Sequence, residues 1–295
     1  MRDFVVLADS TCDLSYEIRK QYGIDYVTMN YIIDDTEYTA SLDWEVHSYR
    51  DFYNEMRNGK RVFTAQVPQN VYYSKFKAVL DEGKDIVYIA CSSALSSSVN
   101  TARVVAGALK KDYADATVYC VDSLISSLGQ GHLAITASKL RDEGKSAQEV
   151  GEYLDSIKLR VNQCGTVESL DYLHRAGRVK ASKAFFGNIF GVKPIIISDI
   201  KGQNYAYKKA KGTLGARAAI AEHIAAAADG NPDTLYISHA DCEEAAMALK
   251  EEILKIAPFK NVITGVIGPI VGASVGPGTV IAFCYGKEVT IEGID

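Results

Sequence analysis

The sequence lacks several features that mark specialised protein classes. Its six cysteines include no Cys-x-x-Cys pair, which disfavours a zinc ribbon or a thioredoxin-like redox centre. Its five histidines show no metal-ligand spacing, so no metal site is indicated. The net charge of -5 comes with no basic domain or stripe, which disfavours nucleic acid as a partner. Residues 1–10 predict no signal peptide, and we expect a cytoplasmic protein with reduced thiols.

Nucleotide-binding signatures and membrane spans are also missing. No Walker loop occurs, and no Gly-x-Gly-x-x-Gly follows the first predicted strand. Residues 261–286 carry no charge and are long enough for a transmembrane helix, but they contain six glycines and two prolines. We therefore interpret this segment as a strand, a glycine loop and a second strand, and expect no transmembrane segment.

The composition is that of a globular protein with a large core. The chain has 295 residues, of which 47% are hydrophobic and 23% charged. This length favours two domains of ordinary size over one large domain.

Predicted strands and helices alternate along the chain, which is typical of an α/β fold. We expect an N-terminal α/β domain over residues 1–160, with a mainly parallel sheet, and a C-terminal α/β domain over residues 161–295, with a mixed sheet. Open parallel sheets bind ligands at the carboxyl ends of their strands, so the polar loops that follow the strands are candidate sites. Strands are predicted at residues 4–8, 26–33, 85–90, 116–122, 162–167, 193–199, 203–209 and 234–238; helices at 14–22, 48–58, 71–82, 99–111, 127–143, 147–158, 170–175, 183–190, 215–228 and 243–256.

A serine-rich loop between a buried strand and a helix is the sharpest local signal. It contains Ser92, Ser93, Ser96, Ser97 and Ser98, more hydroxyls than capping one helix needs. Free N–H groups and the positive end of the helix dipole suit a carboxylate or a phosphate. The alternative is turn and capping chemistry alone.

Two other segments carry candidate binding residues. Thr64 and Gln66 lie in a second polar loop ahead of a helix, where either side chain is placed to face a cleft. Arg175, Arg178 and Lys180 are clustered in an otherwise acidic chain. Such a cluster is either a solvated face or a docking patch for an acidic partner or a phosphate.

Ser274 occupies the centre of a Gly-x-Ser-x-Gly pattern. A hydrolase needs this serine on a sharp turn from a strand to a helix. Gly276-Pro277-Gly278 and a β-rich run follow it instead, so the pattern does not predict a nucleophile.

Together these segments resemble the DegV family of bacterial fatty-acid-binding proteins, and the resemblance runs essentially from end to end. No single motif is specific, but all occur in order and at compatible spacings. The segments that carry the resemblance are Asp9-Ser10-Thr11-Cys12-Asp13-Leu14, Thr64-Ala65-Gln66, Ser92-Ser93-Ala94-Leu95-Ser96-Ser97-Ser98, Asp122-Ser123 with Gly129-Gln130-Gly131, Leu173-His174-Arg175-Ala176-Gly177-Arg178-Val179, Val192-Lys193-Pro194-Ile195, Ile267-Gly268-Pro269 and Gly276-Pro277-Gly278.

The resemblance implies two α/β domains around a buried lipid tunnel that holds a long-chain fatty acid such as palmitate without a covalent bond. It implies that Thr64 and Ser96 bind the carboxylate, with Gln66, Ser93, Ser97 and Ser274 as secondary pocket contacts. Ser274 stands where many members carry a histidine of the head-group network.

The resemblance also implies a non-enzymatic carrier with no cofactor. Its partner is expected to be a fatty acid kinase related to dihydroxyacetone kinases, which makes acyl phosphate for phospholipid synthesis. Arg175, Arg178 and Lys180 are then candidates for the docking surface. The alternatives are a serine-dependent acyl hydrolase or transferase and a protein that binds a phosphate ligand.

Overall fold

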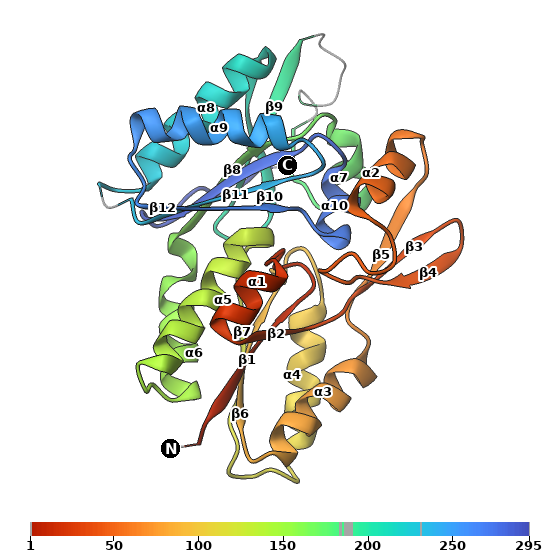
Figure 1. Cartoon of the computed structure of the whole chain (residues 1–295), viewed down its shortest axis with the longest axis vertical. Coiled ribbons are helices and arrows are strands. Elements are labelled where there is room, and N and C mark those ends of the chain that lie inside the picture. Colours follow the sequence, from red (N-terminus) through yellow and green to blue (C-terminus); the bar gives the residue numbers. More distant parts are fainter. Residues whose placement is uncertain (1, 183–184, 186–190, 231, 295) are drawn as a thin grey trace.

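The computed structural model describes residues 2–182, 185, 191–230 and 232–294, which form three β-sheets flanked by helices (Figure 1). The predicted α/β fold with one parallel and one mixed sheet is confirmed. Within the described part of the chain, no helix is long and apolar enough to cross a bilayer, and no three His, Cys, Asp or Glu side chains are grouped to hold a metal ion.

The first sheet is parallel throughout and has the strand order β2-β1-β6-β7. Its strands are β1 (Phe4–Asp9), β2 (Ile24–Val27), β6 (Asp85–Ala90) and β7 (Val118–Asp122). Every residue of β6 is buried, as expected for a central strand covered on both faces. Helices on the two sides of this sheet are α3 (Gln69–Asp81) and α4 (Ser98–Leu109), then α5 (Ser127–Asp142) and α6 (Ala147–Ile157), with α1 (Tyr16–Tyr22) and the short η1 (Lys158–Arg160) completing this part (Figure 1).

A small antiparallel sheet projects from this part of the fold and was missed by the sequence patterns. The single strand predicted at residues 26–33 is wrong, because the chain leaves the parallel sheet after β2. Met29 is buried at this crossing, and its amide donates to Ser10 Oγ at 3.0 Å. The small sheet has the order β4-β3-β5, with β3 (Asn30–Ile33), β4 (Thr36–Thr39) and β5 (Val62–Ala65), and α2 (Tyr49–Arg57) connects β4 to β5.

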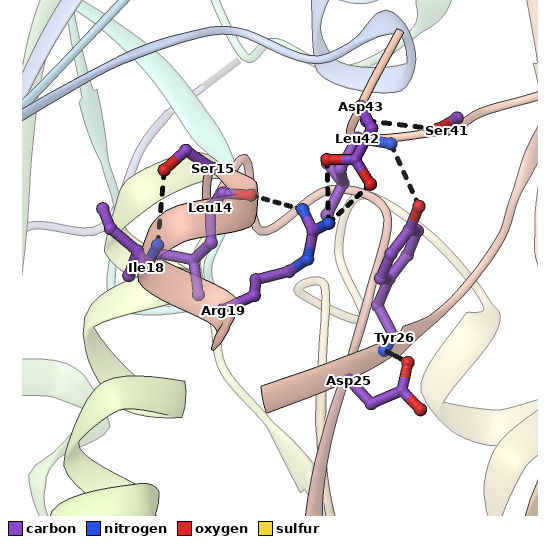
Figure 2. Close-up of polar contacts among 9 residues, drawn as sticks. All are labelled: Leu14, Ser15, Ile18, Arg19, Asp25, Tyr26, Ser41, Leu42 and Asp43. Atoms are coloured by element: carbon purple, nitrogen blue, oxygen red, sulfur yellow. Dashed lines mark hydrogen bonds and ion pairs between the residues drawn. The ribbon is translucent and has the colours of Figure 1, made fainter. Parts of the chain in front are cut away.

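Arg19 anchors the connection between β4 and α2 to the parallel part (Figure 2). Its guanidinium is buried, donates to both carboxylate oxygens of Asp43 at 2.9 and 2.7 Å and to the Leu14 carbonyl at 2.8 Å, and lies over the Tyr26 ring. The Tyr26 hydroxyl in turn accepts the Leu42 amide at 3.3 Å. A buried guanidinium with three partners is costly to disturb, so it holds this connection firmly.

The second large sheet is mixed, with the order β10-β9-β8-β13-β11-β12. Among the described strands of this sheet, β11 and β12 pair in parallel and the other neighbours pair antiparallel. Helices α8 (Gly212–Ala227) and α9 (Glu243–Ile256) pack together on one face (Figure 1). The strands are β8 (Val161–Thr166), β9 (Val192–Ser198), β10 (Asn204–Lys211), β11 (Thr234–His239), β12 (Asn261–Val266) and β13 (Val280–Tyr285).

Helix α5 lies between the two large sheets. It contacts β1 and β6 on one side and β8, β11 and β13 on the other, which explains why most of its residues are buried. Gly129 gives it this close approach, since a Cβ there would lie 2.8 Å from the Phe283 ring. All strands of the parallel sheet precede residue 160 in the sequence, and all strands of the mixed sheet follow it. The division into two domains at residue 160 stays a prediction.

The glycine-rich segment contains a helix where a loop was expected. Residues Pro269–Val275 form α10, between β12 and β13, so the prediction of a glycine loop is wrong. Pro269 occupies the first helical position, where the missing N–H costs nothing, and the helix ends at Gly276-Pro277-Gly278. Helix α10 contacts α7 (Leu170–Ala176). The helix predicted at 183–190 lies largely outside the described residues.

Candidate functional site

A cavity of about 250 Å³ lies where the three sheets and α10 meet. The end of β5, the loop after β6, the strands β8 and β10 and one side of α10 all contribute to its wall. We call it the central cavity. Its lining consists of Thr11, Met29, Thr64, Ala65, Gln66, Cys91, Leu95, Ser96, Ser97, Ser126, Gln163, Arg178, Asn204, Ile270, Val271, Ser274, Val275 and Ile281.

The structure brings Thr64 and Ser96 to this one cavity. Thr64 belongs to strand β5, paired with Tyr31 of β3, and not to a loop as the sequence suggested. Its hydroxyl has no hydrogen-bond partner among the described residues. A partly buried hydroxyl without a partner, at a cavity wall, is available to a ligand.

The serine loop places Ser96 just before α4. Ser97 is the N-cap residue, but its side chain makes no capping hydrogen bond. Ser96 Oγ instead lies 3.3 Å from the Ser98 amide, which donates to it, and 3.0 Å from Ser98 Oγ. The N-terminal end of α4 therefore lies at the cavity wall and favours negative charge there.

The buried Asp9 carboxylate joins the two loops that follow β1 and β6. Its Oδ1 accepts the Thr11 amide at 3.0 Å, and its Oδ2 accepts the Cys91 amide at 2.9 Å and the Tyr88 hydroxyl at 3.0 Å. Gln130 of α5 also donates to Asp9, at 3.2 Å. Because the start of the serine loop is fixed in this way, the cavity wall is positioned by buried charge-assisted bonds.

A second cavity of about 320 Å³ adjoins the first and has four basic residues in its wall, of which Lys60 is ion-paired with Asp34 at 2.9 Å and Glu55 at 2.6 Å. Lys60, Arg61, Arg175 and Arg178 line it, and none of its described lining residues is acidic. We call it the cationic cavity. The residues common to both cavities are Thr64, Arg178 and Ser274.

The structure places the three basic candidate residues in different positions relative to the two cavities. Arg175 is exposed, with its guanidinium 5.0 Å from the centre of the Tyr172 ring, and lines only the cationic cavity. Arg178 is half-buried, and its Nε donates to the Leu95 carbonyl at 3.1 Å. Lys180 lines neither cavity, and its backbone is hydrogen-bonded to Asn204 and Ala206 of β10.

The other candidate residues also separate. Gln66 and Ser97 line the central cavity, whereas Ser93 is exposed and lines neither cavity. Ser274 lies inside α10 and reaches both cavities. It is not on a strand-to-helix turn, so the structure offers no nucleophile elbow at this serine.

Two buried amides in the cavity wall were missed by sequence reasoning. Gln163 of β8 donates to Asn204 Oδ1 at 2.9 Å, and Asn204 donates to the Arg178 carbonyl at 3.0 Å. Their strands are not otherwise apolar, since β8 also contains Asn162 and Thr166 and β10 contains three lysines, so no local sequence signal marked these two amides as buried. They connect the mixed sheet to Arg178.

Cys91 is the thiol of the central cavity. Burial, followed by the charge of Asp9, raises the pKa of the Cys91 thiol well above its ordinary value. The thiol therefore stays neutral and is a poor nucleophile. None of the described residues lining either cavity is a histidine, aspartate or glutamate that could act as its base.

The family model of the DegV family matches residues 3–287. The chain belongs to the DegV family. A DegV domain-containing protein of Clostridium perfringens is 32% identical over 287 residues, which cover 97% of this chain and 98% of the relative. The resemblance expected from the sequence is confirmed.

Two solved DegV structures share the fold and are described as fatty-acid-binding. The Thermus thermophilus protein is 25% identical, with a TM-score of 0.87, and the match covers 97% of this chain and 100% of that one. The DegV protein of Bacillus subtilis is 26% identical, with a TM-score of 0.80 and the same coverage.

Proposed function

We propose that this DegV protein binds one long-chain fatty acid non-covalently, with the carboxylate between Thr64 and Ser96. The observation that carries the proposal is that these two hydroxyls, distant in sequence, line one cavity. The fatty-acid-binding descriptions of its relatives from Thermus thermophilus and Bacillus subtilis support it.

The wall suits an anionic head group. The Thr64 hydroxyl is free to donate, and the N-terminal end of α4 adds partial positive charge beside Ser96. Arg178 lines both cavities and is the one basic residue among the described residues that line the central cavity. Many family members carry a histidine at the position of Ser274. We propose that in this protein Arg178 takes over the role of that histidine and stabilises the carboxylate.

Apolar groups of α10 and β13 suit the acyl chain. Ile270, Val271, Val275 and Ile281 line the central cavity. Each buried methylene contributes about 0.8 kcal/mol, so a sixteen-carbon chain gains on the order of 10 kcal/mol before the costs of ordering and desolvation. We include in this proposal a buried tunnel that holds the whole acyl chain.

We further propose that the protein is a cytoplasmic carrier, not an enzyme, and presents the bound carboxylate to a fatty acid kinase related to dihydroxyacetone kinases for phospholipid synthesis. The cationic cavity beside Thr64 supports this role, because phosphorylation needs access to the carboxylate and compensation of added negative charge. Arg175, exposed at this cavity, is the best-placed docking residue. All six cysteines are free, which suits a reducing compartment.

Mass spectrometry of the purified protein after denaturation tests the binding proposal. We expect a free long-chain fatty acid to co-purify, and delipidated protein to take up palmitate at one equivalent. A covalent acyl-serine would instead indicate a transferase or hydrolase. Absence of both the co-purified lipid and palmitate uptake would refute the proposal.

A further inference from the structure

The loop that carries Ser96 is built around Ser92. Ser92 is fully buried, and its carbonyl accepts the amides of Leu95 and Ser96, both at 2.9 Å. Its hydroxyl accepts the Ala94 amide at 3.2 Å. The position of Ser96 therefore depends directly on the position of Ser92.

A second loop, after β7, holds the serine loop from the side. The Ile125 carbonyl accepts the Ser92 amide at 2.9 Å. Asp122 Oδ1 accepts the amides of Ser93 at 3.0 Å and Leu124 at 3.3 Å. The two loops thus form one hydrogen-bonded unit at the carboxyl ends of β6 and β7.

The tip of the β9–β10 hairpin, from the other large sheet, presses against this unit. Gly202 is buried at the tip with φ +77. A Cβ on Gly202 would lie 2.3 Å from Ser92 Oγ, 2.7 Å from Leu124 Cα and 2.8 Å from the Leu124 carbonyl oxygen. Two of these atoms belong to the backbone, so the loops would have to move to admit a methyl group.

Buried hydrogen bonds hold the hairpin tip in place. A side chain added at Gly202 would therefore displace the two loops and not the tip. Asp199 is buried, and its Oδ1 accepts the amides of Lys201 and Gln203, both at 2.9 Å. Its Oδ2 accepts the Gly293 amide at 3.2 Å, and its carbonyl accepts the Gly202 amide at 2.9 Å. Strand β10 then begins at Asn204, which lines the central cavity.

We infer that Gly202 is a positioning residue for Ser96, acting across the interface of the two large sheets through Ser92. The hairpin tip fixes Ser92, and Ser92 fixes the amide and hence the side chain of Ser96. Two residues further along, the same hairpin supplies Asn204 to the cavity wall. The hairpin therefore links the part of the wall formed by the mixed sheet to the serine loop. The inference about ligand affinity rests on the proposed role of Ser96.

The matched pair Gly202→Ala and Gly144→Ala tests the inference. Gly144 has a similar φ of +83, but a Cβ there would meet nothing within 4 Å. Both variants therefore carry the same kind of backbone strain, and only Gly202→Ala displaces the serine loop. We expect Gly202→Ala to weaken palmitate binding at least tenfold in calorimetry on delipidated protein, with less than a twofold change for Gly144→Ala.

Hydrogen exchange gives a readout that needs no ligand. The amides of Leu95 and Ser96, both bonded to Ser92, should exchange at least tenfold faster in Gly202→Ala than in Gly144→Ala. If the unmodified protein does not bind palmitate, the proposed function fails, while the exchange comparison still decides the positioning role. Equal exchange in the two variants would overturn that role.

A double-mutant cycle separates positioning from general damage. If Gly202 acts through Ser96, Ser96→Ala should cost much less affinity in the Gly202→Ala background than alone. Full additivity would contradict the inference. Should Gly202→Ala fail to fold, Asp199→Ala, which removes the acceptor of the Lys201, Gln203 and Gly293 amides without adding volume, should raise exchange at Leu95 and Ser96 in the same way, and unchanged exchange there would reject the inference.

Discussion

The buried carboxylate of Asp13 accepts the backbone amide of Gly268 at 2.9 Å, across 255 positions of the chain. Gly268 is the N-cap residue of α10, the helix that supplies Ser274 and much of the apolar wall. The other carboxylate oxygen accepts the Ser127 hydroxyl at 2.6 Å, and Ser127 Oγ lies 3.0 Å from Ser238 Oγ. One side chain thus joins the first loop, α5 and α10.

This carboxylate should make stability depend on pH. Burial, the largest cause, raises the pKa of Asp13 from 3.8 to about 7, against the lowering by Ser127 and Gly268. Because the folded protein holds this proton more tightly than the unfolded chain, protonated Asp13 contributes stability that is fully present below pH 3.8. This contribution is lost as the pH rises through about 7. Each pH unit in that window is worth about 1.4 kcal/mol.

Asp13→Asn should remove that dependence, because an amide keeps hydrogen bonds to Gly268 and Ser127 without titrating. Urea unfolding of both proteins from pH 5 to 8 would measure it. We expect the free energy of unfolding of the unmodified protein to fall relative to that of Asp13→Asn between pH 5 and 7. Parallel curves would show that Asp13 does not titrate in this range.

The carboxylate assignment predicts that Thr64→Ala combined with Ser96→Ala weakens palmitate binding without unfolding the protein. Each lost charge-assisted bond should cost about 1.5–3 kcal/mol, hence at least tenfold in affinity. Calorimetry on delipidated protein is the measurement. Ser93→Ala is the control, because Ser93 is exposed in the same loop and lines neither cavity. An unchanged affinity in the double variant would reject these two residues as the head-group site.

The carrier role predicts no esterase activity above background, and no effect of Ser274→Ala on that assay. Ser274 is inside α10, and no described histidine or carboxylate lines the cavities it reaches. Hydrolysis of p-nitrophenyl esters at neutral pH is a sufficient assay. Turnover that disappears with Ser274→Ala would favour the hydrolase alternative.

The placement of the two arginines predicts that they respond differently to charge reversal. Arg178→Glu should weaken palmitate binding and slow acyl-phosphate formation, because Arg178 is part of the cavity wall. Arg175→Glu should slow the kinase step with unchanged palmitate affinity, since exposed charges act mainly on encounter. The measurements are calorimetry and the rate with a cognate fatty acid kinase across a salt series.

Lys180→Glu is the control for both, since Lys180 lies outside the two cavities. If Arg175→Glu and Lys180→Glu leave the kinase rate unchanged, the basic cluster is a solvated surface. If Arg178→Glu leaves palmitate binding unchanged, Arg178 does not contact the head group.

The sequence by itself determined the fold class and most of the elements. A continuous apolar run located β6 and helical periodicity located α9 at the residues the structure gives, because buried strands and amphipathic helices carry their burial pattern locally. The serine density at 92–98 pointed to a loop of the central cavity. The sequence also showed that residues 261–286 do not form one continuous helix, because Gly276-Pro277-Gly278 cannot continue a helix.

Tertiary structure decided what those elements do. The chain leaves the parallel sheet at Met29, whose amide donates to the Ser10 hydroxyl and whose carbonyl accepts the Ala40 amide, and no local pattern predicts these partners. Helix α10 forms in a glycine-rich segment because packing and the Asp13–Gly268 bond stabilise it, whereas propensity alone favours a loop. Gln163, Asn204 and Gly202 matter through contacts made across the fold, and such contacts exist only after the two large sheets have come together.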